Sequence, residues 1–136
     1  MAQFRTLTEA DVRTLLSAYG LASYLGHRPI AAGTINTNVR VETADGPRFL
    51  RVNEGKRLED VEREAAIVAF VAARGVPTPP LFVGQDGHAW TRLGDSYVSL
   101  FPWVEGHTLR RPEVGPTQAR EVGAALARLH LAGKEF

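Results

Sequence analysis

Two oppositely charged residues give the clearest chemical signal in the sequence. Glu64 lies in a stretch with helical periodicity. On that helix it shares the apolar column with Val61, Val68 and Val71. A carboxylate on an apolar helix face needs a compensating partner when the helix packs, and Arg51 on the preceding segment is the nearest cation. The sequence therefore predicts an ion pair between Arg51 and Glu64.

The segments around this pair predict a compact supersecondary unit. Alternating apolar and polar residues over 39–43 predict a strand with Val39, Val41 and Thr43 on one face. The pair Asp45-Gly46 is a strong hairpin signal and leads into a return strand over 48–53. A helix is then expected over 59–74. The polar loop 33–38 before the hairpin reads, from its spacing alone, as an ordinary turn, because it holds a single glycine.

The rest of the chain predicts helices and short strands that complete one sheet. A helix over 8–18 should begin with Thr8 and Asp11 in a capping box and close at Gly20, with one more helical turn at 21–26. Further strands are expected at 28–32, 81–84, 88–92 and 96–104, and a final helix from Pro116 to near Gly133. The fold class is α+β, an antiparallel sheet of about five strands with packed helices.

Composition excludes several classes of protein. The chain has 136 residues, 44% hydrophobic and 23% charged, which fits a single soluble domain. A net charge of +1 without a basic stripe argues against nucleic acid as a partner. The lack of cysteine excludes disulfides and thiolate zinc sites, and the four histidines have no metal-site spacing. No secretory signal and no membrane span are expected, so the expected localisation is cytoplasmic.

Five motifs in order carry a family resemblance. They are GTINTN, FLRV, REAAIVAFVAARGVPTP, YVSLFPWVEG and VGAALARLHLAG. In this order the chain resembles the amino-terminal lobe of the phosphotransferase family of aminoglycoside and choline kinases, and within it homoserine kinases of the bacterial second type. The resemblance covers nearly the whole chain. It implies a protein-kinase-like amino-terminal lobe that binds ATP.

The resemblance assigns roles to particular positions. Loop 33–38 would cover the ATP phosphates, with Arg51 where such kinases carry a phosphate-contacting lysine and Glu64 as its helix anchor. Segment 99–105 would be the hinge that meets the adenine edge, and Val41 and Phe49 would flank the ring. An Arg51–Glu64 pair serving only structure remains the alternative. The implied nucleotide-contacting residues are Gly33, Thr34, Asn36, Thr37, Asn38, Val41, Phe49, Arg51, Glu64, Phe101, Trp103 and Val104.

The catalytic part of the family pattern is missing from these residues. No His-Gly-Asp occurs in the sequence, so the implied proton acceptor and Mg²⁺ ligands are absent together, and no catalytic or metal residue is assigned. We expect residues 1–109 to form the kinase-like lobe and residues 110–136 to be a linker and the start of a helical second lobe. We expect an ATP-dependent small-molecule kinase as part of a longer chain, with the 136-residue piece inactive alone.

The final helix also predicts a contact surface. Its apolar column is Ala119, Val122, Leu126 and Leu129, and little sequence follows to cover it. Either a missing carboxy-terminal lobe or self-association through helix 117–132 would cover it. The alternative to a kinase is a non-catalytic module that binds nucleotide or another protein.

Overall fold

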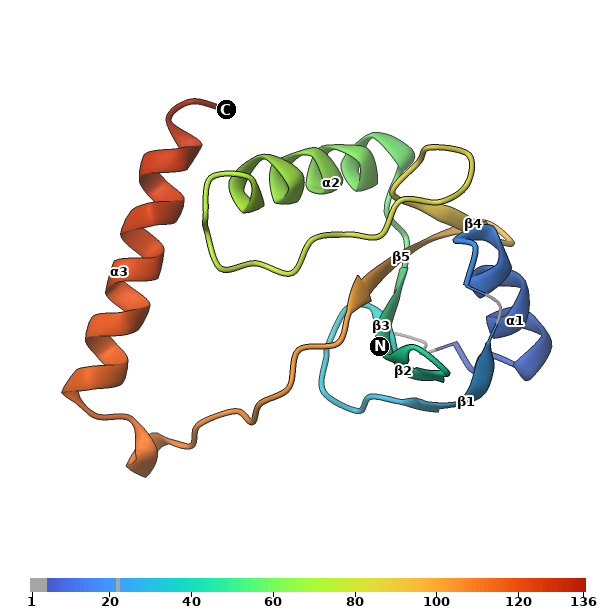
Figure 1. The fold of residues 1–136 in the computed structure, drawn as a ribbon, viewed down its shortest axis with the longest axis horizontal. Coiled ribbons are helices and arrows are strands. Elements are labelled where there is room, and N and C mark those ends of the chain that lie inside the picture. The colour runs from blue at the N-terminus through green and yellow to red at the C-terminus, as the bar shows by residue number, and fades with distance from the viewer. Residues whose placement is uncertain (1–4, 22) are drawn as a thin grey trace.

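The computed structural model describes residues 5–21 and 23–136, and in this part of the chain one antiparallel sheet has the strand order β1-β2-β3-β5-β4 (Figure 1). The strands are β1 (Tyr24–Pro29), β2 (Thr37–Thr43), β3 (Gly46–Asn53), β4 (Thr91–Leu93) and β5 (Ser96–Pro102). The helices are α1 (Glu9–Ala18), α2 (Leu58–Ala72) and α3 (Pro116–Gly133), with a short 3₁₀ turn at Arg111–Glu113. The predicted class, an antiparallel sheet of five strands with packed helices, is confirmed.

The central hairpin forms as the alternation predicts. Strand β2 alternates between buried and half-buried residues along its whole length, with Val39, Val41 and Thr43 buried. Gly46 has φ 102°, a conformation that few other residues adopt, and it opens β3 directly after the turn. The two strands pair in register from Thr37 opposite Val52 to Thr43 opposite Gly46.

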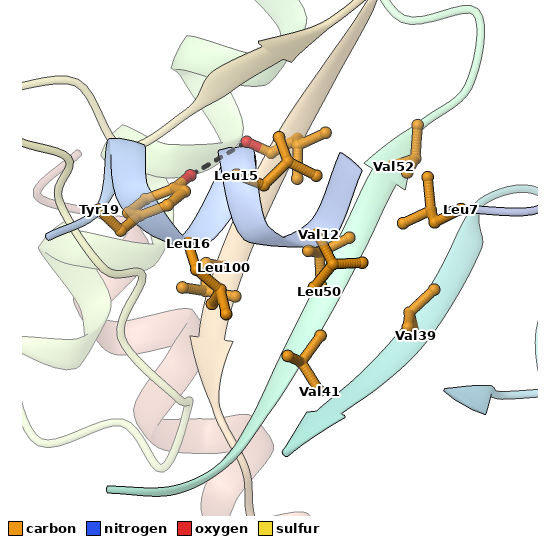
Figure 2. Close-up of a cluster of buried hydrophobic side chains, with 11 residues drawn as sticks. Leu7, Val12, Leu15, Leu16, Tyr19, Val39, Val41, Leu50, Val52 and Leu100 are labelled. Atoms are coloured by element: carbon orange, nitrogen blue, oxygen red, sulfur yellow. Dashed lines mark hydrogen bonds between the residues drawn. The ribbon is translucent and has the colours of Figure 1, made fainter. Parts of the chain in front are cut away.

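Helix α1 closes one side of the sheet over an apolar core. Its amino terminus is the predicted capping box, in which Thr8 Oγ1 accepts from the Asp11 backbone N–H and Asp11 accepts from the Thr8 backbone N–H. Figure 2 shows Val12, Leu15 and Leu16 of α1 pointing onto strands β2, β3 and β5. At its end the Tyr19 hydroxyl donates to the Val98 carbonyl at 3.1 Å. Burial raises the pKa of this phenol well above its usual range.

Helix α3 stands apart from the sheet and touches α2 near its carboxy-terminal end (Figure 1). The segment 103–110 that leads to it contains neither strand nor helix. Arg74 Nε and Glu135 Oε2 are 3.0 Å apart, and the rings of Phe70 and Phe136 meet edge to face at 5.1 Å. Of the helices described, none is long and apolar enough to cross a membrane.

Four local predictions were wrong. Segment 21–26 is not helical where it is described, because β1 begins at Tyr24 and pairs with β2. The first strand therefore lies earlier in the chain than the predicted 28–32. Segment 81–84 lies beside β5 through a hydrogen bond from Phe82 N to Leu100 O, yet it is no strand, since Gly84 N donates to His88 O in a local turn. A strand was predicted from His88, but the backbone N–H of His88 donates to Asp86 Oδ1 within a turn. Strand β4 therefore starts only at Thr91. Residues 1–4, where the absence of a secretory signal was predicted, and residue 22 lie outside the described residues.

Candidate functional site

The two faces of the sheet have different chemistry. Along β3, Leu50 and Val52 face α1 and are buried. The alternate residues Phe49 and Arg51 face α2. We call these the α1 face and the α2 face. Strand register extends the α2 face across the sheet in two rows, one of Arg40, Phe49 and Phe101 and one of Asn38, Arg51 and Ser99.

The predicted ion pair is present on the α2 face. Arg51 Nη1 lies 2.7 Å from Glu64 Oε1, and their side chains are 27% and 35% exposed, so the pair is partly solvated and not deeply buried. The other carboxylate oxygen is bound as well, because Lys56 Nζ lies 2.6 Å from Glu64 Oε2. Glu64 therefore contacts two cations, and the three groups together carry one positive charge.

A cavity of about 420 Å³ opens beside this cluster, between β3, β5 and α2. Its lining combines the ion pair with aromatic and apolar groups: Phe49, Arg51, Glu64, Val68, Thr78, Pro79, Phe101, Pro102, Trp103 and Val104. Cavities of this size and mixture commonly bind small molecules. Four of the residues proposed from sequence line it in addition to the ion pair, and the hinge segment supplies three of those four.

Aromatic rings form part of the cavity wall, and two guanidinium groups pack on these rings. Phe49 and Phe101 meet nearly edge to face at 5.9 Å, and the Arg51 guanidinium lies 5.1 Å from the Phe101 ring centre. The Arg40 guanidinium lies 4.4 Å from the ring centre of Trp103. Within the described chain, Trp103 Nε1 is buried and has no hydrogen-bond acceptor. Buried polar groups in folded proteins are nearly always hydrogen-bonded, so this N–H is unusual.

Within the hinge segment, Trp103 and Val104 follow the end of β5. Pairing between β3 and β5 ends at Arg48 opposite Pro102. The sheet ladder thus does not use the backbone groups of Trp103 and Val104, which line the cavity. This position suits the predicted hinge, in which main-chain groups meet the edge of a base.

The structure separates Val41 and Thr37 from the other residues assigned to the site. Val41 is fully buried on the α1 face, opposite Arg48, so the expectation that Val41 and Phe49 flank one ring is wrong, because they point to opposite sides of the sheet. Thr37 is also buried there, and its hydroxyl donates to Glu54 Oε1 at 2.8 Å. Thr37 therefore fixes local structure instead of facing the cavity.

Loop 33–38 reaches the site through its last residue. Asn38 is opposite Arg51, and its side-chain amide donates to the Ala32 carbonyl at 3.3 Å. Gly33 has φ 144°, and a Cβ there would approach the Asn38 amide nitrogen to 2.8 Å, so this position favours glycine for space and for conformation. Thr34 is exposed, and Asn36 is half-buried. The loop is thus placed next to the cation cluster, not within the cavity lining.

Comparison with known proteins shows the family of the chain. A sequence model described as the phosphotransferase enzyme family matches residues 26–136. The chain belongs to this family. It is 33% identical to a homoserine kinase of Rhizobium rhizogenes over 138 aligned residues and 35% identical to one of Rhizobium etli, in each case over all of this chain and 42% of the kinase. The chain thus spans about two fifths of the length of these curated relatives.

A solved phosphotransferase has the same fold. The crystal structure of a spectinomycin phosphotransferase in complex with ADP and spectinomycin superposes with a TM-score of 0.76, over 94% of this chain and 39% of that one. Sequence identity in that superposition is 14%, so the likeness concerns the fold. The kinase-like amino-terminal lobe predicted from the motifs is confirmed for this member of the phosphotransferase family.

The sequence reasoning did not assign the lining residues Val68, Thr78 and Pro79 to the site, and it missed three residues next to the lining. Lys56 follows Gly55, which has φ 65°, in a turn whose geometry sequence spacing does not reveal. Arg40 was assigned only to the non-core face of its strand, and its position over Trp103 depends on pairing across three strands. Asn53 is buried and donates to Ser99 Oγ at 3.0 Å, a bond between strands far apart in sequence.

Proposed function

We propose that this chain is the ATP-binding part of a small-molecule kinase that transfers the γ-phosphate of ATP to a substrate hydroxyl, with homoserine as the substrate. The observation that carries the proposal is the Arg51–Glu64 ion pair on the wall of a cavity that is also lined by aromatic rings and by the hinge segment. Membership of the phosphotransferase family and about one-third identity to homoserine kinases support it.

Each part of the cavity has a role in this proposal. The adenine ring packs against Phe49 and Phe101, and its edge meets the backbone of Trp103 and Val104. The phosphates extend toward Arg51, with Asn38 of the neighbouring row at the end of the loop. A guanidinium can bind two phosphate oxygens at once, whereas a lysine ammonium acts as a point charge. Glu64 keeps Arg51 oriented toward the phosphates.

The remaining chemistry is assigned to other parts of a longer polypeptide. Mg²⁺, which supplies charge neutralisation between the phosphates during transfer, requires carboxylate or amide oxygens. Among the described residues, no group of three or more His, Cys, Asp or Glu side chains could hold a metal ion. We assign the metal ligands and the proton acceptor to the part of the relatives that this chain does not match.

Direct binding measurements test the proposal. Titration calorimetry of the 136-residue chain with ATP and with adenosine is expected to detect both ligands, with ATP bound more tightly through Arg51. Phe49→Ala should weaken both ligands. Arg51→Ala should weaken ATP and leave adenosine unchanged. A folded chain that binds neither ligand contradicts the proposal, and phosphate transfer to homoserine is not expected from these residues alone.

One observation favours an additional role in association. The apolar side chains of α3 are exposed, with Val122 at 67% and Leu126 at 49%. We place residues 1–109 in the kinase-like lobe and residues 110–136 in a linker and the first helix of a second lobe. The rest of that second lobe would cover the apolar side chains of α3, and self-association would cover them equally. Sedimentation velocity of the 136-residue chain tests this role, since a monomer that binds no hydrophobic dye contradicts it.

A further inference from the structure

Lys56 occupies a place that the proposed binding of ATP does not itself require. Its ammonium contacts Glu64 Oε2 at 2.6 Å, while Arg51 contacts the other oxygen of the same carboxylate. The described residues that line the cavity include Arg51 and Glu64 but not Lys56. Lys56 therefore contacts the carboxylate without lining the cavity, and its observed link to the cavity is through Glu64.

The turn that carries Lys56 is fixed at both ends. On one side, Glu54 Oε1 accepts from Thr37 Oγ1 at 2.8 Å, which ties the turn to the start of β2, and the backbone N–H of Arg5 donates to the same hydroxyl at 2.9 Å. On the other side, α2 begins at Leu58. Gly55 between them has φ 65°. A lysine held in such a turn loses less backbone freedom on forming its contact than one on a mobile loop.

The charge balance decides what the second cation does. With Arg51 alone, Glu64 would neutralise the guanidinium, and the pair would present little net field to an anion in the cavity. With Lys56 on the second oxygen, the cluster has a net positive charge. Arg51 is the cation of this cluster that lines the cavity. The side chains are 27–35% exposed, so each contact is partly screened and its energetic effect is modest.

We propose that Lys56 is a positioning residue that neutralises Glu64 through its second oxygen, so that Arg51 keeps its orientation and presents an uncompensated positive charge to the polyphosphate of the nucleotide. This inference rests on the proposed function. In this proposal the three residues have different roles: Glu64 orients Arg51, Arg51 contacts the phosphates, and Lys56 gives the cluster its net positive charge. It also predicts that Lys56 matters in proportion to the charge of the ligand.

The test compares ligands of different charge on matched variants by titration calorimetry. Lys56→Met is expected to weaken ATP about fivefold, a change typical of a partly exposed ion pair, and to change adenosine less than about twofold. Lys56→Arg should restore ATP affinity because it restores the charge. Lys134→Met removes the only other lysine of the sequence, at the end of α3, and should leave both ligands unchanged.

A double-mutant cycle separates action through Glu64 from direct contact with the phosphates. When Glu64→Gln has removed the negative charge, adding Lys56→Met should change ATP affinity less than about twofold. A fivefold loss in that background would overturn the inference, and so would a Lys56→Met variant that binds ATP as tightly as the parent. A parent that is folded but binds no ATP refutes the proposed function itself and the inference with it. Thermal unfolding of each variant checks that the fold is intact.

Discussion

The α1 face and the α2 face are built from alternate residues of the same strands, yet they differ in almost every physical property. On the α1 face, Leu50 is 1% exposed within a continuous apolar cluster closed by α1. On the α2 face, its neighbours Phe49 and Arg51 are half-buried and line an open cavity. We infer from this difference that the α1 face provides the stability of the fold. The α2 face can therefore hold partly solvated charges.

The largest test of this comparison substitutes adjacent residues of β3. Leu50→Ala should lower the free energy of unfolding by about 3 kcal/mol, because it removes a fully buried side chain and leaves a cavity under α1. Phe49→Ala is the matched variant on the α2 face and should cost less, since its ring is half-buried beside an existing cavity. Urea unfolding followed by circular dichroism measures both. Equal costs would show that the faces do not differ as described.

The ion pair sharpens the comparison on the α2 face. Arg51→Ala should lower the free energy of unfolding by only about 1 kcal/mol, because the side chains are partly exposed and Lys56 still compensates Glu64. A fully buried pair without Lys56 would cost about 3 kcal/mol or more on losing one partner. Arg51→Ala with Glu64→Gln should regain part of the stability without regaining ATP affinity. Affinity equal to the parent in this double variant would make the pair purely structural.

An effect of similar size on stability belongs to the Tyr19 hydroxyl, which reaches into the α1 core. Tyr19→Phe removes the bond to the Val98 carbonyl and should lower the free energy of unfolding by about 1 kcal/mol. Nucleotide affinity should stay unchanged, because Tyr19 lies on the α1 face. Thermal unfolding and ATP titration of the same sample make the check. A change in affinity without a change in stability would couple the two faces unexpectedly.

The smallest expected effect is the pH dependence of the α1 cap. Hydrogen bonds from the Thr8 backbone and side chain hold the pKa of Asp11 below its ordinary value of 3.8. Because the folded-state pKa is the lower one, the stabilisation is present above pH 3.8 and is lost as the pH falls through the folded pKa. Asp11→Asn should reduce stability by about 0.5 kcal/mol at neutral pH and by nothing in strong acid. A stability difference that does not vary with pH would contradict this origin.

Local patterns were sufficient for most of the fold. The hairpin of β2 and β3, the capping box of α1 and the bounds of α3 follow from alternation, turn chemistry and helix signals within a few residues of each other. The limits of β1 and β4 could not be obtained in this way, because pairing with a neighbouring strand determines them. Propensity is a weak guide where such pairing can override it.

The site was predicted in its central contact and missed in its surroundings. Helical spacing was enough to show that Glu64 needed a cation, and Arg51 is that cation. The opposite orientation of Val41 and Phe49 follows from the strand register, and a motif match that assigns both to one ring ignores it. Lys56 was missed because its approach to Glu64 depends on the conformation of a glycine turn, which residue identity alone does not fix.

The stacking of Arg40 on Trp103 has an optical consequence. The emission of an indole depends on the charges around its ring, and this indole lies in the cavity wall under a guanidinium. The other tryptophan of the sequence, Trp90, packs edge to face on Tyr97 at 5.3 Å, at the opposite end of β5. In a Trp90→Phe background, fluorescence would report on the cavity wall alone. Trp103 is thus a spectroscopic probe within the protein itself. Displacement of Arg40 by an incoming anion would shift the emission wavelength of Trp103.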